Sequence, residues 1–253
     1  NLYQVLVTST TDEPTVGAAA DPKTWGLFGK INRWRMFDGS TRQSTADDDE
    51  IEVHIIPGQV VSAIALFKLG GGGEVRVWME DPVDGIVYDQ TLGLIDNSNV
   101  VDFYTYAFEP FQQRYDAVFT GLPPYGSATI KVRLAATNAS IAQLAIGRLR
   151  NIGLTLNGTS VGTVRYGTRR TDEFGNTSFV RRQSVKRANF ECTVETSQID
   201  RVQRQLDDER DQPVAFIGDE GFDSLLIFGS YLDFDITFRG PSISDGVIRV
   251  EGL

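Results

Sequence analysis

The chain contains one cysteine, Cys192, and one histidine, His54, among its 253 residues. A single cysteine excludes a disulfide bond within the chain. One cysteine and one histidine, far apart in the sequence, also leave little material for a zinc site or a Cys/His nucleophile pair. Cys192 falls on the apolar side of a strand pattern, which is typical of a small buried residue, whereas His54 falls on the polar side of another strand. Neither residue is predicted to carry chemistry.

Basic charge and long apolar runs are also scarce. The chain has 24 basic against 34 acidic residues, a net charge of −10, which argues against a general nucleic-acid binder because neutralising phosphates needs a basic excess. No run of about 18 apolar residues occurs, so no membrane span is predicted. The 23% of charged residues and 41% of hydrophobic ones are typical of a soluble globular protein. The first residue is Asn1 rather than methionine, as expected of a processed or partial product.

Catalytic motifs are absent too. The four glycines at 70–73 are not followed by Lys-Ser/Thr or by a helix, so we expect a flexible hairpin tip rather than a phosphate loop. The four consecutive acids at 47–50 predict a solvated loop more than a calcium site, because calcium needs oxygens from several segments. No Gly-x-Ser-x-Gly elbow occurs, and no local motif selects a carboxylate pair for glycoside cleavage. The sequence therefore predicts no enzyme and no catalytic, cofactor or metal site.

The chain does show the alternation of apolar and polar residues that is typical of β-strands. From 51 to 146 one strand follows another with turn signals between them, and apolar residues alternate with polar ones at 74–79 and 129–134. This pattern predicts an all-β dominated fold, with a jelly roll or β-sandwich over residues 46–155. Residues 1–45, rich in Thr, Pro, Gly and Ala and then in aromatics, are predicted to form an N-terminal arm.

Residues 156–253 are predicted to form a C-terminal β domain with one α-helix that serves in assembly. A hairpin turn is expected at 172–176, where Gly175 and Asn176 can take positive φ values. A capped helix is expected to begin at Ser197 and to end before Pro213, with an apolar stripe at Ile199, Val202 and Leu206. Strands are predicted at 190–195, 214–217 and 232–239.

Three aromatic residues are candidate glycan or interface contacts: Trp78, Trp34 and Tyr88. Trp78 is the sharpest of them, because it shares the outward face of its strand with Glu74 and Arg76, and a sugar ring can stack on an exposed indole. The alternative, that Trp78 packs under the N-terminal arm or against another subunit, remains open.

Charges of opposite sign gather on separate elements of the C-terminal domain. The candidate subunit-interface residues are Arg181, Arg182, Lys186 and Arg187 beside the hairpin, and Asp207 and Asp208 at the end of the helix. This arrangement suits a repeated subunit whose basic side meets the acidic side of the next copy, so a homo-oligomer is expected. Pairing of these charges within one chain is the open alternative.

Several segments resemble virion proteins of tailed bacteriophages. Residues 25–29 and 32–38 are similar to an arm with Trp and Gly followed by Asn-Arg-Trp-x-x-Phe-Asp, which leads in those proteins into a β-sandwich of carbohydrate-binding-module type. The C-terminal domain of those proteins is similar to this chain at residues 171–176, 181–187, 213–218, 228–234 and 251–253. The resemblance covers both ends of the chain and leaves the sandwich body unmatched.

The resemblance implies a tail-tip or baseplate component, similar in role to distal tail proteins, which join the tail tube to the adhesion device through rings of identical subunits. It further implies a tail-tube-like C-terminal fold, other tail and baseplate proteins as partners, and localisation in the virion after synthesis in the host cytoplasm. A module that binds a host surface glycan is the second expectation, and a glycan-degrading enzyme is the least favoured. No cofactor is implied.

Overall fold

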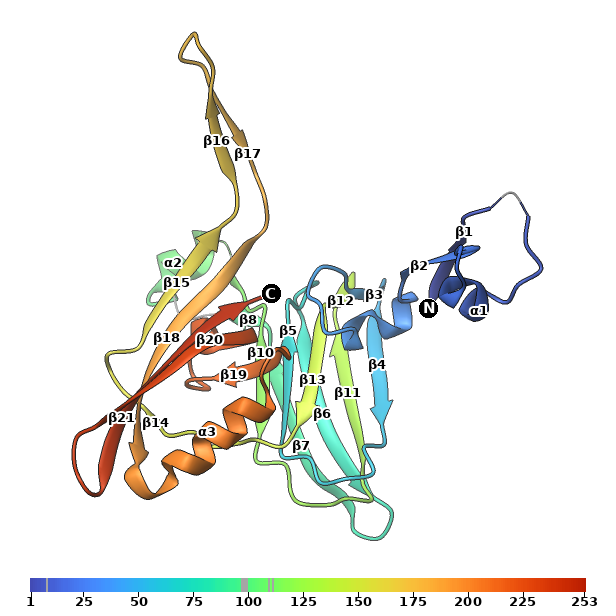
Figure 1. The fold of residues 1–253 in the computed structure, drawn as a ribbon. Helices are drawn as coiled ribbons and strands as arrows, with labels where there is room; N and C mark the ends of the chain where they lie inside the picture. Colours follow the sequence, from blue (N-terminus) through green and yellow to red (C-terminus); the bar gives the residue numbers. More distant parts are fainter. Residues whose placement is uncertain (8, 97–99, 109, 111) are drawn as a thin grey trace.

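The computed structural model describes residues 1–7, 9–96, 100–108, 110 and 112–253 (Figure 1). Strands take up 48% of the residues and helices 14%, which confirms the predicted all-β dominated class. No helix in the described ranges is both long and apolar enough to cross a membrane. Two units, an N-terminal sandwich with an arm and a C-terminal sheet with a helix, pack side by side (Figure 1).

The first unit consists of two antiparallel sheets packed face to face. One sheet has the order β4 (Glu50–Ile55), β11 (Thr129–Ala135), β6 (Glu74–Asp81) and β7 (Gly85–Gly93), and the other the order β10 (Ala117–Thr120), β5 (Ala63–Phe67) and β13 (Gln143–Gly147). Because side chains alternate along a strand, Val75, Val77 and Met79 all point inward and are fully buried. The predicted alternation at 74–79 is thereby confirmed.

The glycine run at 70–73 is not a hairpin tip, and that prediction is wrong. It connects β5 to β6, which belong to different sheets, so the chain must cross from one layer to the other there. Gly71, Gly72 and Gly73 all have positive φ, which glycine adopts without steric cost. The run is tied down, because the Gly70 N–H donates to the Ser140 carbonyl and the Leu94 N–H to the Gly73 carbonyl.

The second unit is a six-stranded antiparallel sheet with one helix on it. The strands are β14 (Leu154–Thr155), β18 (Ser184–Glu195), β21 (Ile243–Gly252), β20 (Leu226–Phe238) and β19 (Val214–Ile217) in that order, with β15 (Ser160–Arg165) paired to β18 as well. Helix α3 (Ile199–Asp208) buries the predicted stripe of Ile199, Val202 and Leu206 against the sheet. Cys192 lies buried in the same core, and this burial raises the pKa of its thiol.

The start of α3 differs from the prediction. A 3₁₀ turn, η2 (Thr196–Gln198), precedes the helix, and the residue at its N-terminal boundary is Gln198, which makes no side-chain capping bond. The Thr196 hydroxyl instead pairs with Ser244 Oγ at 2.8 Å. The serine-type cap predicted at Ser197 is therefore wrong, because Ser197 lies inside the 3₁₀ turn and no side-chain cap precedes α3.

A two-stranded hairpin, β16 (Thr168–Thr171) and β17 (Thr177–Val180), projects from the end of β15 and β18 (Figure 1). The predicted turn is confirmed, with positive φ at Gly175 but not at Asn176. The Asp172 carboxylate accepts hydrogen bonds from the Asn176 and Phe174 backbone N–H groups at 2.7 and 3.0 Å. These bonds, with one from the Asn176 side chain as the largest contribution, lower the pKa of Asp172.

The N-terminal arm consists of β1 (Leu2–Val5), α1 (Pro14–Ala19) and β2 (Trp25–Gly29), and the 3₁₀ helix η1 (Asn32–Phe37) attaches it to β3 (Thr45–Asp47). The Asn32 amide pairs with Ala46 as a strand would, donating to its carbonyl at 2.8 Å and accepting from its N–H at 3.0 Å. The remaining short elements are β8 (Ile95–Asp96), α2 (Phe103–Phe108), β9 (Gln112–Gln113), β12 (Ala139–Ile141) and η3 (Asp223–Leu225).

An apolar layer joins the two units. Phe67 on β5 and Phe228 on β20 are 3% and 6% exposed, and their ring centroids lie 5.5 Å apart. Ala65 and Leu226 complete the buried part of this layer. The outer face of the three-stranded sheet is therefore covered by the second unit, whereas the outer face of the four-stranded sheet is open.

A charged cluster borders this layer. Lys186 of β18 forms an ion pair with the buried Asp116 of the first unit and donates to the Asp223 carbonyl at 2.8 Å. Lys68 donates to Thr41 Oγ1 at 2.6 Å and to the Leu253 carbonyl at 3.2 Å. Burial lowers the pKa of Lys68 and raises the pKa of Asp223. The cluster fixes one unit against the other at the C-terminal end of β21.

Candidate functional site

The most conspicuous feature of the surface is apolar side chains on extensions that have no core of their own. Phe28 in the N-terminal arm is 72% exposed, Phe103 at the start of α2 is 82% exposed and Phe174 at the tip of the β16–β17 hairpin is 89% exposed. A two-stranded hairpin alone is at best marginally stable in water, and clustered exposed apolar residues mark interaction sites. In the chain by itself these extensions expose apolar surface to solvent.

The second sheet also has two open edges. Strand β15 pairs with β18 along its whole length, and no other described strand pairs with its free side. On the opposite side, β19 pairs only with residues 226–229 of β20, so residues 231–238 form a second edge in the described structure. Unpaired backbone N–H and C=O groups on an edge are a ready template for another strand.

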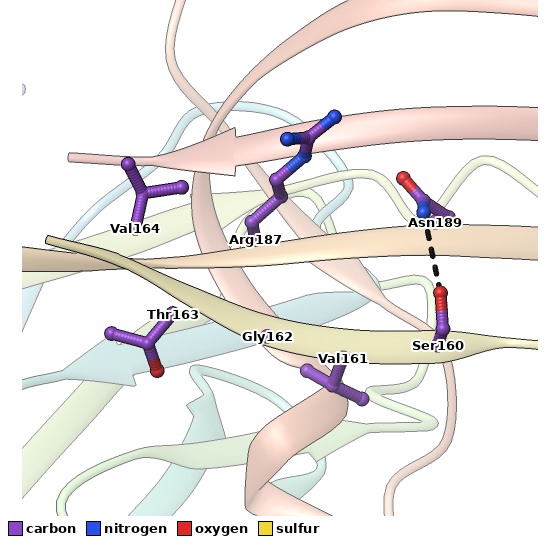
Figure 2. Close-up of a pocket in the computed structure, with 7 residues that line it drawn as sticks. All are labelled: Ser160, Val161, Gly162, Thr163, Val164, Arg187 and Asn189. Carbon is purple, nitrogen blue, oxygen red and sulfur yellow. Dashed lines mark hydrogen bonds between the residues drawn. The ribbon is translucent and has the colours of Figure 1, made fainter.

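A shallow groove of about 380 Å³ lies on the ribbon formed by β15 and β18 at the base of the hairpin. Val161 and Thr163 point to one side of the ribbon, and Arg187 and Val164 to the other (Figure 2). The Asn189 side-chain Nδ2 donates to Ser160 Oγ at 3.2 Å. The side-chain Oδ1 of Asn189 is shielded from solvent and has no hydrogen-bond partner in the described residues. The polar side chains that line this groove are Ser160, Thr163, Arg187 and Asn189.

The predicted basic residues have different surroundings. Arg181, Arg182 and Arg187 are exposed, and no acidic group of the described residues forms an ion pair with them. Lys186 instead pairs with Asp116 between the two units. Alternation along β18 places Lys186 on the side of Phe190 and Cys192. Its partner Asp116 becomes apparent only once the strand lies beside the first unit.

The predicted acidic residues lie at the end of α3. Asp207 is 3.4 Å from an Arg210 nitrogen, and Asp208 is 3.9 Å from Arg150, which also approaches Glu209 at 3.3 Å. None of these acids contacts the basic residues near the hairpin. The structure therefore does not pair the two charged groups within one chain.

A wider groove of about 720 Å³ separates α3 from β20. Its apolar lining comes from Leu206, Tyr231, Leu232, Phe234 and Ile236, and its charged lining from Asp207, Arg210, Asp211 and Asp233. Leu232 begins the strand predicted at 232–239, and it is 53% exposed. The apolar face of β20 is thus covered at its start and left open in this groove.

Trp78 lies on the open outer face of the four-stranded sheet. In the register across the sheet it stands between Lys131 of β11 and Asp89 of β7. The Arg76 guanidinium lies 4.8 Å from the indole centroid, and Arg76 also donates to Asp89 at 2.8 and 2.6 Å. That bond lowers the pKa of Asp89, and a bond from Lys131 lowers the pKa of Glu80. Trp78 is thus the centre of a flat face of fixed charges.

The other two aromatic candidates are elsewhere. Tyr88 points to the opposite side of the sheet, where its hydroxyl donates to the Thr120 carbonyl at 3.1 Å and burial raises its pKa. Trp34 belongs to η1, where it is 51% exposed and packs against Phe37 with ring centroids 6.0 Å apart. No ring contact among the described residues joins Trp78, Tyr88 and Trp34, so the structure does not assemble them into one site.

Asp48 and Asp49 form the turn between β3 and β4, while Asp47 and Glu50 are the adjoining strand ends. All four acids are exposed, as expected of a solvated segment. The Glu50 carboxylate accepts from Arg133 at 2.5 Å across the sheet. Within the described ranges, no three acidic, histidine or cysteine side chains come together in a way that could hold a metal ion.

Comparison with known proteins adds no relative. No protein-family model matches the chain, and no curated protein matches it significantly. The function must therefore be inferred from the chain's own surfaces, chiefly from its uncovered extensions, its open sheet edges and its flat charged face.

Proposed function

We propose that this protein is a structural component of a bacteriophage tail, located at the baseplate or tail tip, that oligomerises and links the tail tube to the host-adhesion apparatus. The observation that carries the proposal is the set of extensions that lack a core: the N-terminal arm, the α2 segment and the β16–β17 hairpin. In an isolated chain they expose apolar surface without benefit, whereas in an assembly each is covered by a neighbour.

The division of the chain fits this role. In the proposal, the six-stranded sheet with its helix is a tail-tube-like assembly domain, whose two open edges and hairpin hold neighbouring subunits. The sandwich is a jelly roll of the carbohydrate-binding-module type, and it projects outward from the ring. The rigid apolar layer around Phe67 and Phe228 then transmits the position of the ring to the projecting module.

The partners in this proposal are other copies of the chain and other tail and baseplate proteins, and the location is the virion after synthesis in the host cytoplasm. In this role the protein assembles and does not turn over a substrate, and the role requires no cofactor, nucleic acid or membrane.

Light scattering on the purified chain and gold labelling of phage particles test this role. We expect a defined oligomer in size-exclusion chromatography with light scattering, and antibodies against the chain should label one end of the tail in electron micrographs. An unrelated capsid antibody provides the control for labelling. A chain that stays monomeric at its highest soluble concentration and is absent from purified particles would exclude the role.

A glycan-binding module in the same apparatus is the second candidate, and the flat face around Trp78 favours it. An indole flanked by Arg76, Asp89 and Lys131 offers a stacking surface together with hydrogen-bond donors and acceptors. On an array of host surface glycans we expect Trp78→Ala to weaken binding about tenfold, because stacking on an aromatic ring is worth about 1.5 kcal/mol. Trp34→Ala, which removes an exposed indole elsewhere, is the matched control. Unchanged binding by Trp78→Ala would remove this face as the glycan site.

A further inference from the structure

We infer that the β16–β17 hairpin of one copy inserts into the groove between α3 and β20 of a neighbouring copy. The inference rests on the proposed oligomer and names the contact that builds it. The partner of the groove is therefore a second copy of this chain, and the contact joins two different patches.

The hairpin presents a cation and an aromatic ring on one face. Arg169 and Phe179 stand directly opposite each other across the two strands, with the guanidinium carbon 5.9 Å from the ring centroid. Phe179 is 72% exposed, and Phe174 at the tip is more exposed still. Arginine and aromatic residues are the side chains that most often dominate binding energy in interfaces, so this face has the composition of an anchor.

The charges of the two elements are complementary. Residues 165–187, the hairpin with its base, carry seven basic residues against two acidic ones, a net charge of +5 in a chain whose total is −10. Arg169 and Arg170 on the hairpin are balanced by Asp172 and Glu173, and Lys186 pairs with Asp116. The excess that faces outward therefore lies at the base of the hairpin, on Arg165, Arg181, Arg182 and Arg187. Residues 199–238, which contain α3 and the groove strand, carry ten acidic residues against three basic ones, a net charge of −7. Such a difference steers encounter and suppresses the reverse pairing of like patches.

The groove offers places for this anchor. Tyr231, Phe234 and Ile236 are only partly covered by the core of the second unit, so the groove has an apolar floor. Arg210 is held by Tyr231, a contact that raises its pKa, and by Asp207. Asp233 Oδ2 accepts from Arg249 of the same chain at 2.6 Å. Among the acids of the groove, the one that forms no ion pair within the described residues and can face an incoming arginine is therefore Asp211.

The hairpin cannot reach the groove of its own copy. In the strand register, Asp233 of β20 lies opposite Arg249 of β21, and Arg249 lies opposite Asn189 of β18. The groove is therefore level with Asn189, five residues after Ser184, where β18 begins. The hairpin tip at Phe174 lies ten residues beyond Ser184 in the other direction. At about 3.3 Å per residue the tip and the groove are on the order of 50 Å apart. Figure 1 shows the hairpin and α3 at opposite ends of the sheet.

Charge exchange in the full-length chain tests the contact. Arg169→Glu/Arg170→Glu should raise the concentration for half assembly more than tenfold in light scattering. Asp207→Lys/Asp211→Asn should do the same; asparagine is chosen because position 211 has positive φ, which asparagine tolerates. Because the first pair makes the hairpin acidic and the second makes the groove less acidic, an equimolar mixture of the two variants should assemble better than either alone. Arg133→Glu/Arg148→Glu makes the same charge change as the hairpin variant at two exposed positions of the sandwich, and it should assemble like the unaltered chain.

Photo-crosslinking gives a second measurement that does not depend on charge. A benzoyl-phenylalanine in place of Phe174 should form crosslinks between copies to peptides from 199–211 or 230–238. Crosslinks only to other peptides would overturn the contact, and so would assembly that the hairpin substitutions leave unaffected. In either case, antibody labelling of phage particles would still support the tail role. A monomeric unaltered chain would also overturn the contact, and labelling of particles would then decide the tail role separately.

Discussion

Phe228→Ala is expected to separate the two units, at a cost of about 3 to 5 kcal/mol, which is typical of removing a buried phenylalanine ring. The ring is 6% exposed and packs on Phe67 of the sandwich, and the cavity would open in the layer that joins the two units. The loss therefore removes coupling between the units as well as stability.

Two probes can follow this separation in urea. All three tryptophans, Trp25, Trp34 and Trp78, lie in the first 78 residues, so their fluorescence reports on the arm and sandwich, whereas far-ultraviolet circular dichroism reports on the whole chain. In the unaltered chain the two transitions should coincide, and in Phe228→Ala they should part, with the circular dichroism transition beginning at lower urea. Phe222→Ala removes a ring that is 61% exposed and should change neither transition. Coincident transitions in Phe228→Ala would show that the charged cluster around Lys186 and Asp116 alone holds the units together.

Gly73→Ala is expected to cost at least as much, about 4 kcal/mol, because two penalties combine there. The residue has φ of +84°, and an added Cβ would lie 2.0 Å from the Ala135 carbonyl oxygen. That oxygen belongs to the backbone at the end of β11 and cannot turn away as a side chain can. The chain must then shift where it passes from one sheet of the sandwich to the other.

The neighbouring glycine separates these two penalties. Gly72 has φ of +69° but no atom within 4 Å of an added Cβ, so Gly72→Ala should cost only the conformational part, about 1 to 2 kcal/mol. The measurement is the free energy of unfolding in urea from tryptophan fluorescence, which follows the sandwich. Equal losses for the two variants would mean that the loop shifts freely and that Gly73 is not packed as described.

Short-range patterns predicted the elements well. The alternation at 74–79, the apolar stripe of α3 and the turn containing Gly175 were all confirmed, because burial of one face and a positive φ leave direct marks in neighbouring residues. Predictions that depended on distant segments did worse. The predicted cap of α3 was wrong because a 3₁₀ turn at 196–198 takes in Ser197, and the predicted hairpin tip at the glycine run was wrong because β5 and β6 belong to different sheets.

The sequence by itself determined that this is a β-rich chain with one amphipathic helix, a basic hairpin and an acidic helix end, since each of these is a property of residues near each other in the chain. Only the tertiary structure decided which of those residues meet. It turned Lys186 inward against Asp116, set Trp78 apart from Tyr88, left Leu232 in an open groove and carried the hairpin far from that groove. Strand pairing joins residues tens of positions apart, and no local pattern records the side on which a strand will find its neighbour.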